Sequence, residues 1–570
     1  MNAGDQIDGG AGTDTLKVFG TYNAAQMPVS IKNVEVLDIA TLADAALDLS
    51  SLTKAATGIG NVVVGNAAAV SGKQITTGDG QSISLSTGAA NLKTAGAVTW
   101  AASTKDTTVN LTLNGYQGAD TNANAQNLTV TAAQATTMNL AATGAASKVS
   151  TFTLGAKTNK LVVTGDQKLT VTTDVVSSGG ATVLKTIDAS ANTGGVSMTL
   201  AAATNAAFAF TGGSGNDTIV FADDGLAALT SGSQLDGGDG SADKIGINDT
   251  VITTKEYSAL NAAKNFEVLG LNGAVTVDAS QLTGLKTFSL DANAAQVIAN
   301  AATGTVVNVA VAHAANITLG GAVGVNDVTV NVGSATSTGL TVGGALKIGQ
   351  TNVALTSNGN GTGTNTITTL TNADNSVYTI TGSNDLTISA VSATAIGSKY
   401  DASGLSGKLN ITGNTTAFSA GSSLGDIIIG GSGADTIKAS VNSSTLTGNA
   451  GNDTFDVSAA VAAATANYAV TSITDFTVGD KIKFGATAGA FTKAAVDLSS
   501  AATLADALNL LVAGSNTDVK WGVYGGNTYL VDDVNALASI QANDTVVKIV
   551  GEVSLAASTF DAGTNTLTFA

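Results

Sequence analysis

Several residue types are missing from this sequence or rare in it. It has no Cys, which excludes a disulfide framework and zinc sites built on thiolates. It has no Arg, so all 24 basic residues are Lys, and two-pronged Arg recognition of phosphate or carboxylate is excluded. No segment approaches the roughly 18 apolar residues of a membrane-spanning helix. The first residues, MNAGDQIDGG, lack the charged and then apolar pattern of a signal peptide.

Basic charge is scarce relative to acidic charge. The formal net charge is −18, and no basic stripe exists to meet phosphates, which argues against nucleic acid or an anionic membrane as a partner. Of 42 acidic residues only Glu35, Glu256, Glu267 and Glu552 are Glu, so 38 are Asp. Asp favours turns, caps and calcium loops, whereas Glu favours helices. With 67 Gly and one Pro, this composition predicts a turn-dense β protein.

Short alternating segments fill the region from Val62 to Phe210. Examples are SISLST, TVNLTLNG, NLTVTAA, KLVVTG and VSMTLAAA, which Gly, Asn, Asp or Ser separate. This pattern predicts an all-β, elongated, multi-domain fold. The Ala-, Thr- and Ser-rich strands favour a β-solenoid, and β-sandwich modules are the alternative. A disordered chain is disfavoured by the 44% apolar content and by the alternation itself.

The most regular stretch is 421–456, GSSLGDIIIGGSGADTIKASVNSSTLTGNAGNDTFD. It contains four successive nonapeptides, and the second, GGSGADTIK, matches the calcium β-roll repeat G-G-x-G-x-D-x-U-x, in which U is a large apolar residue. We expect one short strand per nonapeptide and two nonapeptides per turn of the roll. The apolar residues predicted to fill its core are Ile428, Ile437, Leu446 and Phe455.

Two nonapeptides per turn place residues 18 apart on the same side of the roll. Gly-rich loops let backbone carbonyls approach a cation, and Asp supplies charged oxygen, which is the ligand set of Ca²⁺. We therefore predict a calcium ion between Asp435 and Asp453, whereas Asp426 stacks on Ser444 and lacks a second carboxylate. Single carboxylate pairs of this kind bind weakly, on the order of 10⁻⁴–10⁻³ M.

Related loops occur twice more in the chain. One begins at Gly4 and includes GGAGTDTL, and the other comprises TGGSGNDTIVF and SQLDGGDGSADKIGI. In an isolated loop of this type the Asp can instead cap its own turn. The predicted calcium ligands and their loop glycines are Asp5, Gly10, Gly12, Asp14, Gly212, Gly215, Asp217, Asp236, Asp239, Asp243, Asp426, Gly430, Gly433, Asp435, Gly451 and Asp453.

The chain also contains an internal duplication. GDQIDGGAG at Gly4 corresponds to GSQLDGGDG at Gly232, and IKNVEVLDI at Ile31 corresponds to AKNFEVLGL at Ala263, at nearly the same separation. In the strand regions, DASANTGG at Asp188 corresponds to DASGLSGK at Asp401. We therefore divide the chain into a truncated first roll with its strands (1–60), a strand region (61–210), second calcium loops (211–250), a second strand region (251–420), the third roll (421–456) and a C-terminal β domain (457–570).

The C-terminal domain differs in composition from the rest. Thr503 to Val512, TLADALNLLV, is predicted as a short amphipathic helix with Leu504, Leu508 and Leu511 on one face. KWGVYGGNTYLVDD, DTVVKIVGEVSL and NTLTFA are predicted as antiparallel strands. Because the first roll starts partway through a repeat, we also expect the chain to be the C-terminal part of a longer protein.

Sequence patterns for catalysis are few, and we predict that the protein is not an enzyme. The single His, His313, lies in an alternating segment, where it is predicted to pack in or on a strand. The motif H-E-x-x-H is absent, and a Ser-His-Asp or Cys-His arrangement would depend on this one residue. A glycosidase needs only two carboxylates, so the sequence does not exclude this class of enzyme.

These motifs resemble the RTX (repeats-in-toxin) proteins that Gram-negative bacteria export by type I secretion. Within that group, GGAGTDTL followed by SIKNVEVLDI, ITDFTVGDKI after the last roll and YGGNTYLVDD…DTVVKIVGEVSL near the end are most similar to surface-layer (S-layer) proteins. The resemblance implies a calcium-dependent fold, an uncleaved secretion signal within the last hundred or so residues, and extracellular self-assembly into a two-dimensional lattice.

The same resemblance implies partners and leaves alternatives. S-layer proteins bind lipopolysaccharide or a related cell-surface polysaccharide through an N-terminal domain, and nothing in this chain resembles that domain. The predicted function is thus a structural S-layer protein whose main partner is itself. An RTX adhesin or biofilm-matrix protein with the same export route is the alternative, and the accessory region of an exported hydrolase is a third.

Overall fold

The structure is a computed structural model. It describes residues 4–21, 30–41, 46–65, 73–86, 97–116, 127–200, 205–230, 232–322, 324, 327–373, 375–391, 397–414, 425–441, 443–459, 470–485, 488–514, 517–535, 537–541 and 544–570.

The chain is almost entirely β, with 47% of residues in strands and 6% in helices, and it forms a parallel β-solenoid of about 17 turns. Along most of the chain, successive strands alternate between two sheets, and a strand pairs in parallel with the strand one turn away. The turns differ in length, because Ile428 stacks on Leu446 in a short turn and Val98 stacks on Leu128 in a much longer one. Parallel pairing is what a solenoid requires, whereas the β-sandwich alternative would have antiparallel sheets.

The contacts divide the chain into two compact units, residues 1–272 with 281–285 and residues 273–280 with 286–570. In the first unit, one sheet is formed by β2 (Thr15–Thr21), β4 (Val36–Thr41), β6 (Asn61–Val64), β8 (Ser82–Ser86), β10 (Thr108–Asn114), β12 (Thr137–Ala142), β14 (Lys160–Gly165), β16 (Thr186–Asn192), β18 (Ala209–Thr211) and β20 (Gln234–Asp236). The facing strands are β5 (Ala46–Asp48), β7 (Lys73–Thr76), β9 (Ala97–Ala101), β11 (Asn127–Thr131), β13 (Ser147–Leu154), β15 (Leu169–Ser177), β17 (Val196–Leu200), β19 (Thr218–Phe221), β21 (Lys244–Ile247) and β22 (Val268–Leu271). The short strands β1 (Gln6–Asp8) and β3 (Ser30–Lys32) pair separately.

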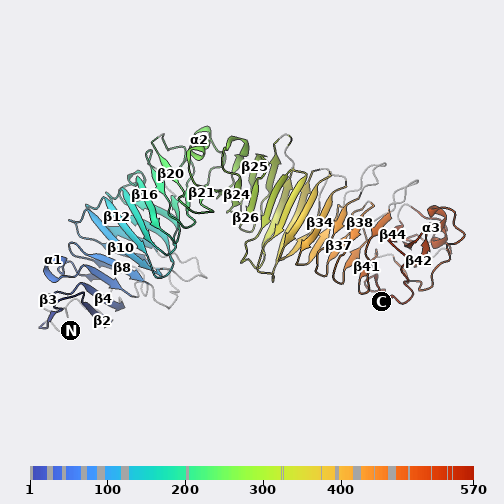
Figure 1. The fold of residues 1–570 in the computed structure, drawn as a ribbon, viewed down its shortest axis with the longest axis horizontal. Coiled ribbons are helices and arrows are strands. Elements are labelled where there is room, and N and C mark those ends of the chain that lie inside the picture. The colour runs from blue at the N-terminus through green and yellow to red at the C-terminus, as the bar shows by residue number, and fades with distance from the viewer. Residues whose placement is uncertain are drawn as a thin grey trace. The chain divides into compact units, whose positions relative to one another are not determined.

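The second unit repeats this two-sheet plan. One sheet contains β23 (Thr276–Asp278), β25 (Gln296–Ala301), β27 (Ile317–Gly321), β29 (Thr341–Ile348), β31 (Thr364–Asn372), β33 (Asp385–Ile388), β35 (Leu409–Thr412), β37 (Thr436–Lys438), β39 (Thr454–Asp456), β41 (Lys481–Lys483), β46 (Thr566–Thr568) and β45 (Thr559–Asp561). The facing strands are β24 (Thr287–Leu290), β26 (Val306–Val309), β28 (Asp327–Val332), β30 (Asn352–Ser357), β32 (Val377–Gly382), β34 (Lys399–Leu405), β36 (Ile427–Ile429), β38 (Thr445–Thr447), β40 (Val470–Ile473), β44 (Thr545–Ile549), β43 (Asn527–Asp532) and β42 (Val519–Tyr524). Figure 1 shows strands of successive turns side by side within each unit.

The core lies between the two sheets of each unit and follows from the alternation in the sequence. In β10, TVNLTLN, every second residue (Val109, Leu111 and Leu113) is buried, while the residues between them face outward. The same apolar positions stack from turn to turn, as Val109 does on Met138. Small outward Thr, Ser and Ala residues let neighbouring turns approach closely, so the predicted link between composition and a solenoid is confirmed.

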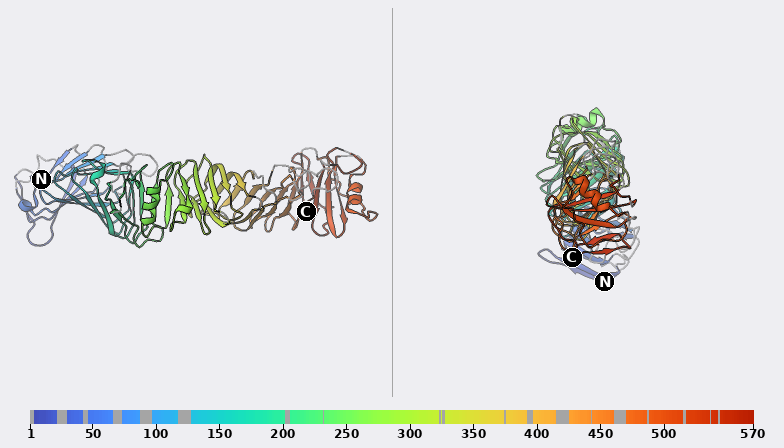
Figure 2. Two further views of the ribbon diagram at one scale, coloured as in Figure 1. Left: turned by 90° about the horizontal axis from the view of Figure 1, so that it is seen from above. Right: turned by 90° about the vertical axis from the view of Figure 1, so that its right-hand side faces the viewer.

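Helices are short and few in the described part of the chain. They are α1 (Lys54–Thr57), α2 (Thr254–Ala262) and α3 (Leu504–Val512), with the 3₁₀ turns η2 (Ala181–Val183) and η3 (Ala279–Gln281). The predicted helix α3 begins after Thr503, whose side chain forms a capping box with Asp506. Its buried residues Leu508 and Leu511 pack on β43 and β44, and Figure 2 shows this helix beside the C-terminal strands.

The C-terminal strands pair antiparallel, as predicted. β42 and β43 form a hairpin whose two central residues, Gly525 and Gly526, both have positive φ (55° and 76°). That conformation is typical of the tight hairpin turn that glycine allows. β43 then pairs antiparallel with β44, and β45 with β46. Among the described residues, the helices are all too short or too polar to cross a membrane.

Candidate metal-binding site

The strands of the third roll have the predicted spacing and pairing. Strands β36, β37, β38 and β39 are nine residues apart, and they alternate between the two sheets of the second unit. β36 pairs with β38 and β37 pairs with β39, so the stacking of alternate nonapeptides is as predicted. The four predicted core residues, Ile428, Ile437, Leu446 and Phe455, are fully buried. Residues 421–424, at the start of the first nonapeptide, lie outside the described residues.

Buried Asp residues form a continuous chain of hydrogen bonds along this roll, which we call the second-unit ladder. The backbone N–H of Asp435 donates to the Asp453 carboxylate (2.8 Å), and the N–H of Asp453 donates to Asp480 (2.8 Å). Asp435 in turn accepts from the N–H groups of Leu409 (2.7 Å) and Gly431 (2.6 Å). All three Asp residues are only 1% exposed. The sequence predicted the first pair but missed Asp480.

Burial perturbs the carboxyl groups of this ladder. It raises the pKa of Asp435 to about 6 in spite of the two backbone donors. It raises the pKa of Asp453 to about 6 as well, with further increases from the negative charges of Asp435, Asp480 and Asp475. These carboxylates are therefore costly to keep ionised at neutral pH unless a cation compensates them.

The glycines of the repeat are needed for space beside these carboxylates. A Cβ atom on Gly430 would collide with the Asp435 Oδ2 atom and lie 2.6 Å from the Gly448 carbonyl oxygen. A Cβ atom on Gly448 would collide with Asp453 Oδ2, and one on Gly451 with the Gly433 carbonyl oxygen. Carboxylate and carbonyl oxygens from neighbouring turns thus come close together at positions where only glycine fits. This donor set is the one that Ca²⁺ prefers.

A matching ladder occurs in the first unit. The N–H of Asp217 donates to Asp243 (2.7 Å), and the N–H of Asp243 donates to the Glu267 carboxylate (2.8 Å). Asp217 accepts from Val196 and Gly213, each at 2.6 Å. Burial, aided by the charges of Asp217 and Glu267, raises the pKa of Asp243 to about 6. Asp243 Oδ2 is buried and accepts no well-formed hydrogen bond from the described residues, although the backbone N–H of Gly240 lies near enough to lower the pKa of this carboxyl.

A hydrogen bond near the start of the chain corresponds to the last hydrogen bond of this ladder, from Asp243 to Glu267. The N–H of Asp14 donates to the Glu35 carboxylate (2.7 Å), and Asp14 Oδ2 also lacks a donor among the described residues. Asp8 accepts from Asn33 (2.8 Å) just as Asp236 accepts from Asn265 (2.7 Å). The duplicated sequence therefore produces duplicated contacts.

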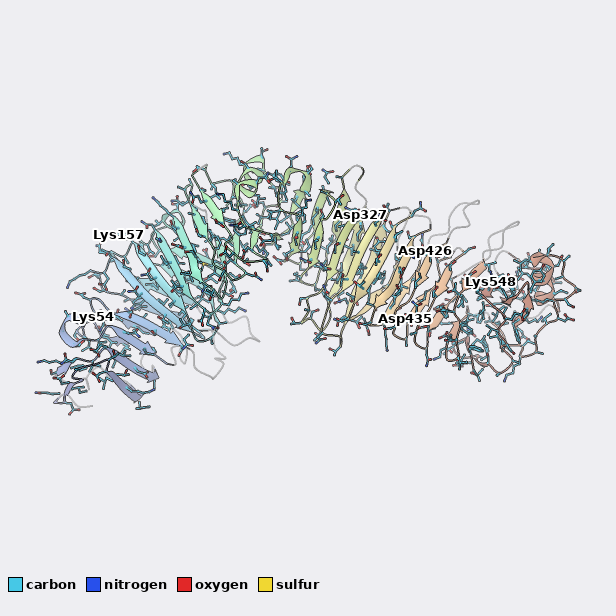
Figure 3. The ribbon with its side chains drawn as sticks, in the orientation of Figure 1. Lys54, Lys157, Asp327, Asp426, Asp435 and Lys548 are labelled. Carbon is cyan, nitrogen blue, oxygen red and sulfur yellow. The ribbon has the colours of Figure 1, made fainter. Side chains whose placement is uncertain are left out.

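The other predicted ligands have different surroundings. Asp426 is buried, which raises its pKa, but its neighbour is a pair of Ser hydroxyls (Ser440 and Ser444, 2.6 Å apart) in place of a carboxylate. Figure 3 labels Asp426 and Asp435, which lie at opposite edges of the roll. Asp236 accepts the N–H of Gly238 two residues later (3.1 Å), so it caps its own turn.

The remaining predicted positions lie at the edges of these loops. Asp5 and Asp239 are exposed, and the N–H of Asp239 donates to the Gly213 carbonyl (2.8 Å). Gly10 and Gly12 have positive φ, which favours glycine. Cβ atoms on Gly212, Gly215 and Gly433 would each meet backbone atoms of a neighbouring turn at 3.0 Å or less.

His313 is a packing residue, as the sequence predicted. Its side chain is 1% exposed, with Nδ1 2.7 Å from the Val311 carbonyl oxygen and Nε2 3.0 Å from Gln296 Oε1. Burial lowers the pKa of its imidazole, so the neutral ring is favoured.

The sequence did not identify Glu35, Glu267 and Asp480 as hydrogen-bond acceptors, because the nonapeptide consensus contains only one acidic position, its own Asp. Glu35 and Glu267 sit in the shared string K-N-x-E-V-L, whose recurrence in both copies was the available signal. Asp480 lies farther beyond Asp453 than two nonapeptides would place it, and only the pairing of Phe455 with Ile482 brings it into line.

The ladders and their glycine loops fit calcium by the chemistry of their donors. Within the described residues neither ladder brings three carboxylate oxygens within 4.8 Å of one another, so an ion would lie at one step of a ladder. In the second unit that step is Asp435 with Asp453 or Asp453 with Asp480, and in the first it is Asp217 with Asp243 or Asp243 with Glu267. A bound Ca²⁺ would compensate the negative charge of carboxylates that are buried between successive turns. Neither the family models nor the curated proteins compared with this chain include a match to it.

Proposed function

We propose that this chain is a structural protein of the S-layer type, which assembles in a calcium-dependent way into a two-dimensional lattice on a Gram-negative cell surface. Its principal partner is a second copy of itself. It is exported by type I secretion and acts outside the cell, where millimolar calcium can fill weak sites. It carries no catalytic activity in this proposal.

The observation that carries the calcium part of the proposal is the pair of ladders. Each places three acidic side chains in successive turns, with loop glycines that leave room for carbonyl oxygens beside them. Burial raises the pKa of Asp243, Asp435 and Asp453 to about 6, so a nearby positive charge would stabilise their ionised forms. A divalent cation supplies it and joins one turn to the next.

Calcium then couples folding to location. In a calcium-poor cytosol the carboxylates repel one another, which keeps the chain loose enough for export. Outside the cell, ions that bind only the folded chain add their binding free energy to its stability. The same charge accounts for dependence of the lattice on calcium, because surfaces of a chain at −18 repel one another without it.

The lattice part of the proposal is supported by the resemblance of the C-terminal strings ITDFTVGDKI and YGGNTYLVDD to S-layer proteins, and by the solenoid itself. A solenoid grows by adding turns and presents long lateral faces, which suits a protein that packs beside copies of itself. A lipopolysaccharide or polysaccharide partner would be bound by a region outside this chain.

Electron microscopy of dilute protein during calcium addition tests the proposal. We expect the wild type to form ordered sheets or rings and the double variant Asp435→Asn/Asp453→Asn to remain dispersed. The matched control is Asp188→Asn/Asp401→Asn, because it removes the same charge from partly exposed residues that pair with Lys160 and Lys399. The control should assemble like the wild type.

Two outcomes would contradict the proposal. Assembly of the ladder variant at the same calcium concentration as the wild type would separate the ladders from the lattice. Wild-type protein that stays monomeric in millimolar calcium and binds cells or glycans would identify an adhesin instead.

A further inference from the structure

A second group of acids in the first unit lies outside the ladders. Asp224 follows β19, Asp249 follows β21, and Glu256 lies in the first turn of α2. One carboxylate oxygen from each of these residues lies within 4.8 Å of the others. Two oxygens bound to the same Ca²⁺, at 2.3–2.6 Å each, are separated by up to about 5 Å, so this spacing suits one ion.

Local structure fixes the two inner members of this group. The Glu256 side chain completes the capping box of α2, because its Oε2 atom accepts from the Thr253 N–H (2.6 Å) and hydroxyl (2.9 Å). Asp249 Oδ1 accepts the N–H of Asp224 (2.6 Å). One oxygen of each carboxylate is therefore held by the protein, and the other is not.

Those other oxygens are buried without donors. Glu256 is 1% exposed and Asp249 is 3% exposed, and no donor in the described part of the chain reaches Glu256 Oε1 or Asp249 Oδ2. A buried acceptor without a partner is costly, and two that face each other as anions are more so. Either a shared proton or a bound cation must neutralise them.

The third carboxylate favours a cation. Asp224 is exposed and has a positive φ of 58°, a conformation that few non-glycine residues adopt. Its carboxylate adds a third negative charge to the group. One shared proton neutralises a single charge, whereas a divalent cation neutralises two and accepts water at its open positions.

The duplicated segment provides a comparison within the same unit. Between Asp14 and Glu35 the first copy has no acidic residue, whereas the second copy has Asp249 and Glu256 between Asp243 and Glu267. The shared turn forms in both copies with the same hydrogen bonds. The two acids are therefore not required by the turn, and they accompany the helix that only the second copy's sequence encodes with a T-x-x-E cap.

From this geometry we propose that Asp224, Asp249 and Glu256 form a calcium site that fastens the start of α2 to the turns ending in β19 and β21. It is separate from the ladders and independent of lattice formation. The positive end of the α2 dipole opposes a cation here, but it amounts to about half a charge against three carboxylates. Hard oxygen donors select Ca²⁺ over softer metals.

Calcium binding and hydrogen exchange on the full chain test this site. The variants are Glu256→Gln, in which Gln preserves the capping box, and Asp249→Asn, in which Oδ1 can still accept from Asp224. The control is Asp188→Asn. By equilibrium dialysis we expect each site variant to bind one Ca²⁺ fewer per chain than the wild type and the control. Calcium-dependent protection of amides in 250–263 should be lost, while protection in 426–456 is retained.

The wild type alone can overturn the proposal, whether or not the variants fold. If calcium leaves exchange in 250–263 unchanged in the wild type, the acids share a proton and hold no ion. Unchanged stoichiometry in folded Glu256→Gln would lead to the same conclusion. Calcium-dependent protection of 250–263 without any in 426–456 would support this site and contradict only the function of the second-unit ladder.

Discussion

The two ladders are built on different spacings and reach the same arrangement. In the second unit the acids are 18 and 27 residues apart, at Asp435, Asp453 and Asp480, whereas in the first they are 26 and 24 apart, at Asp217, Asp243 and Glu267. In both, each N–H group donates to the carboxylate one turn ahead. The position of an acid in the stack of turns therefore matters more than its place in a nonapeptide.

The ladders differ in how well the protein satisfies them. The first acids are satisfied alike, because both oxygens of Asp435 and both oxygens of Asp217 accept backbone N–H groups. The difference lies at the second acid of the first-unit ladder, where Asp243 Oδ2 is buried without a well-formed hydrogen bond from the described residues. We infer that the first-unit ladder depends on calcium more strongly than the regular roll, although its sequence matches the consensus less well.

Calcium removal should have the largest effect and should separate the ladders. A site that binds only the folded chain contributes about 2.7 kcal/mol when free calcium is a hundredfold above the dissociation constant. Scanning calorimetry in calcium and after chelation should show a lower melting temperature for both units, with the larger decrease in the first. A β-sheet circular dichroism signal and melting profile unaffected by exhaustive chelation would refute calcium dependence in both ladders.

Asp532 is a buried acid outside the ladders, and its pKa shows the effect of burial without backbone N–H donors. Burial and the charges of Asp544 and Asp533 raise its pKa to about 7, and no described residue donates to either of its oxygens. Because the folded pKa exceeds the ordinary value of 3.8, the folded state gains stability at low pH and loses it as pH rises through about 7.

Asp532→Asn should therefore stabilise the protein above pH 7 and flatten this part of the pH dependence. Denaturant unfolding of the wild type and the variant at pH 5 and pH 8 measures the difference. A variant that is equally destabilised at both pH values would show that Asp532 has an unrecognised partner.

The glycines that face the carboxylates should come next in size. Gly430→Ala and Gly212→Ala place a Cβ atom against Asp435 Oδ2 and Asp217 Oδ2, respectively, and overpacking of this kind costs about 1–3 kcal/mol. Gly284→Ala is the control, because no heavy atom lies within 4 Å of its Cβ position. Chemical denaturation should leave the control within about 0.5 kcal/mol of the wild type. Equal effects at all three positions would mean that the space beside the carboxylates is not tight.

The final acid of each ladder should have the smallest effect. Asp480→Asn and Glu267→Gln keep an oxygen that can accept the N–H of Asp453 or Asp243, so we expect about 1 kcal/mol or less from the loss of a charge-assisted bond. Thermal shift in calcium measures this directly. An effect larger than that of the glycine variants would make the last acid the principal ligand.

Much of this structure could be predicted from the sequence, because each strand of the solenoid shows which residues are buried through its alternation of apolar and polar residues. Alternation identified buried positions such as Val109, and the nonapeptides fixed the stacking of Ile428 on Leu446. The sequence could not align Asp480 or Glu267 with the other acids, because loops of unequal length change the spacing from one turn to the next. Helix α2 was missed because its Ala-, Asn- and Ser-rich turns have a weak apolar stripe, and only Thr253 and Glu256 signalled its start.

The hydrogen bonds of the ladders all run in one direction along the chain. In every step the N–H group belongs to the earlier residue and the carboxylate to the later one, as in Asp14 to Glu35, Asp217 to Asp243 and Asp435 to Asp453. A chain that folds from its C-terminal end therefore sets each carboxylate in place before the amide that binds it arrives. In that order of folding, each finished turn would present its carboxylate as a template for the next turn.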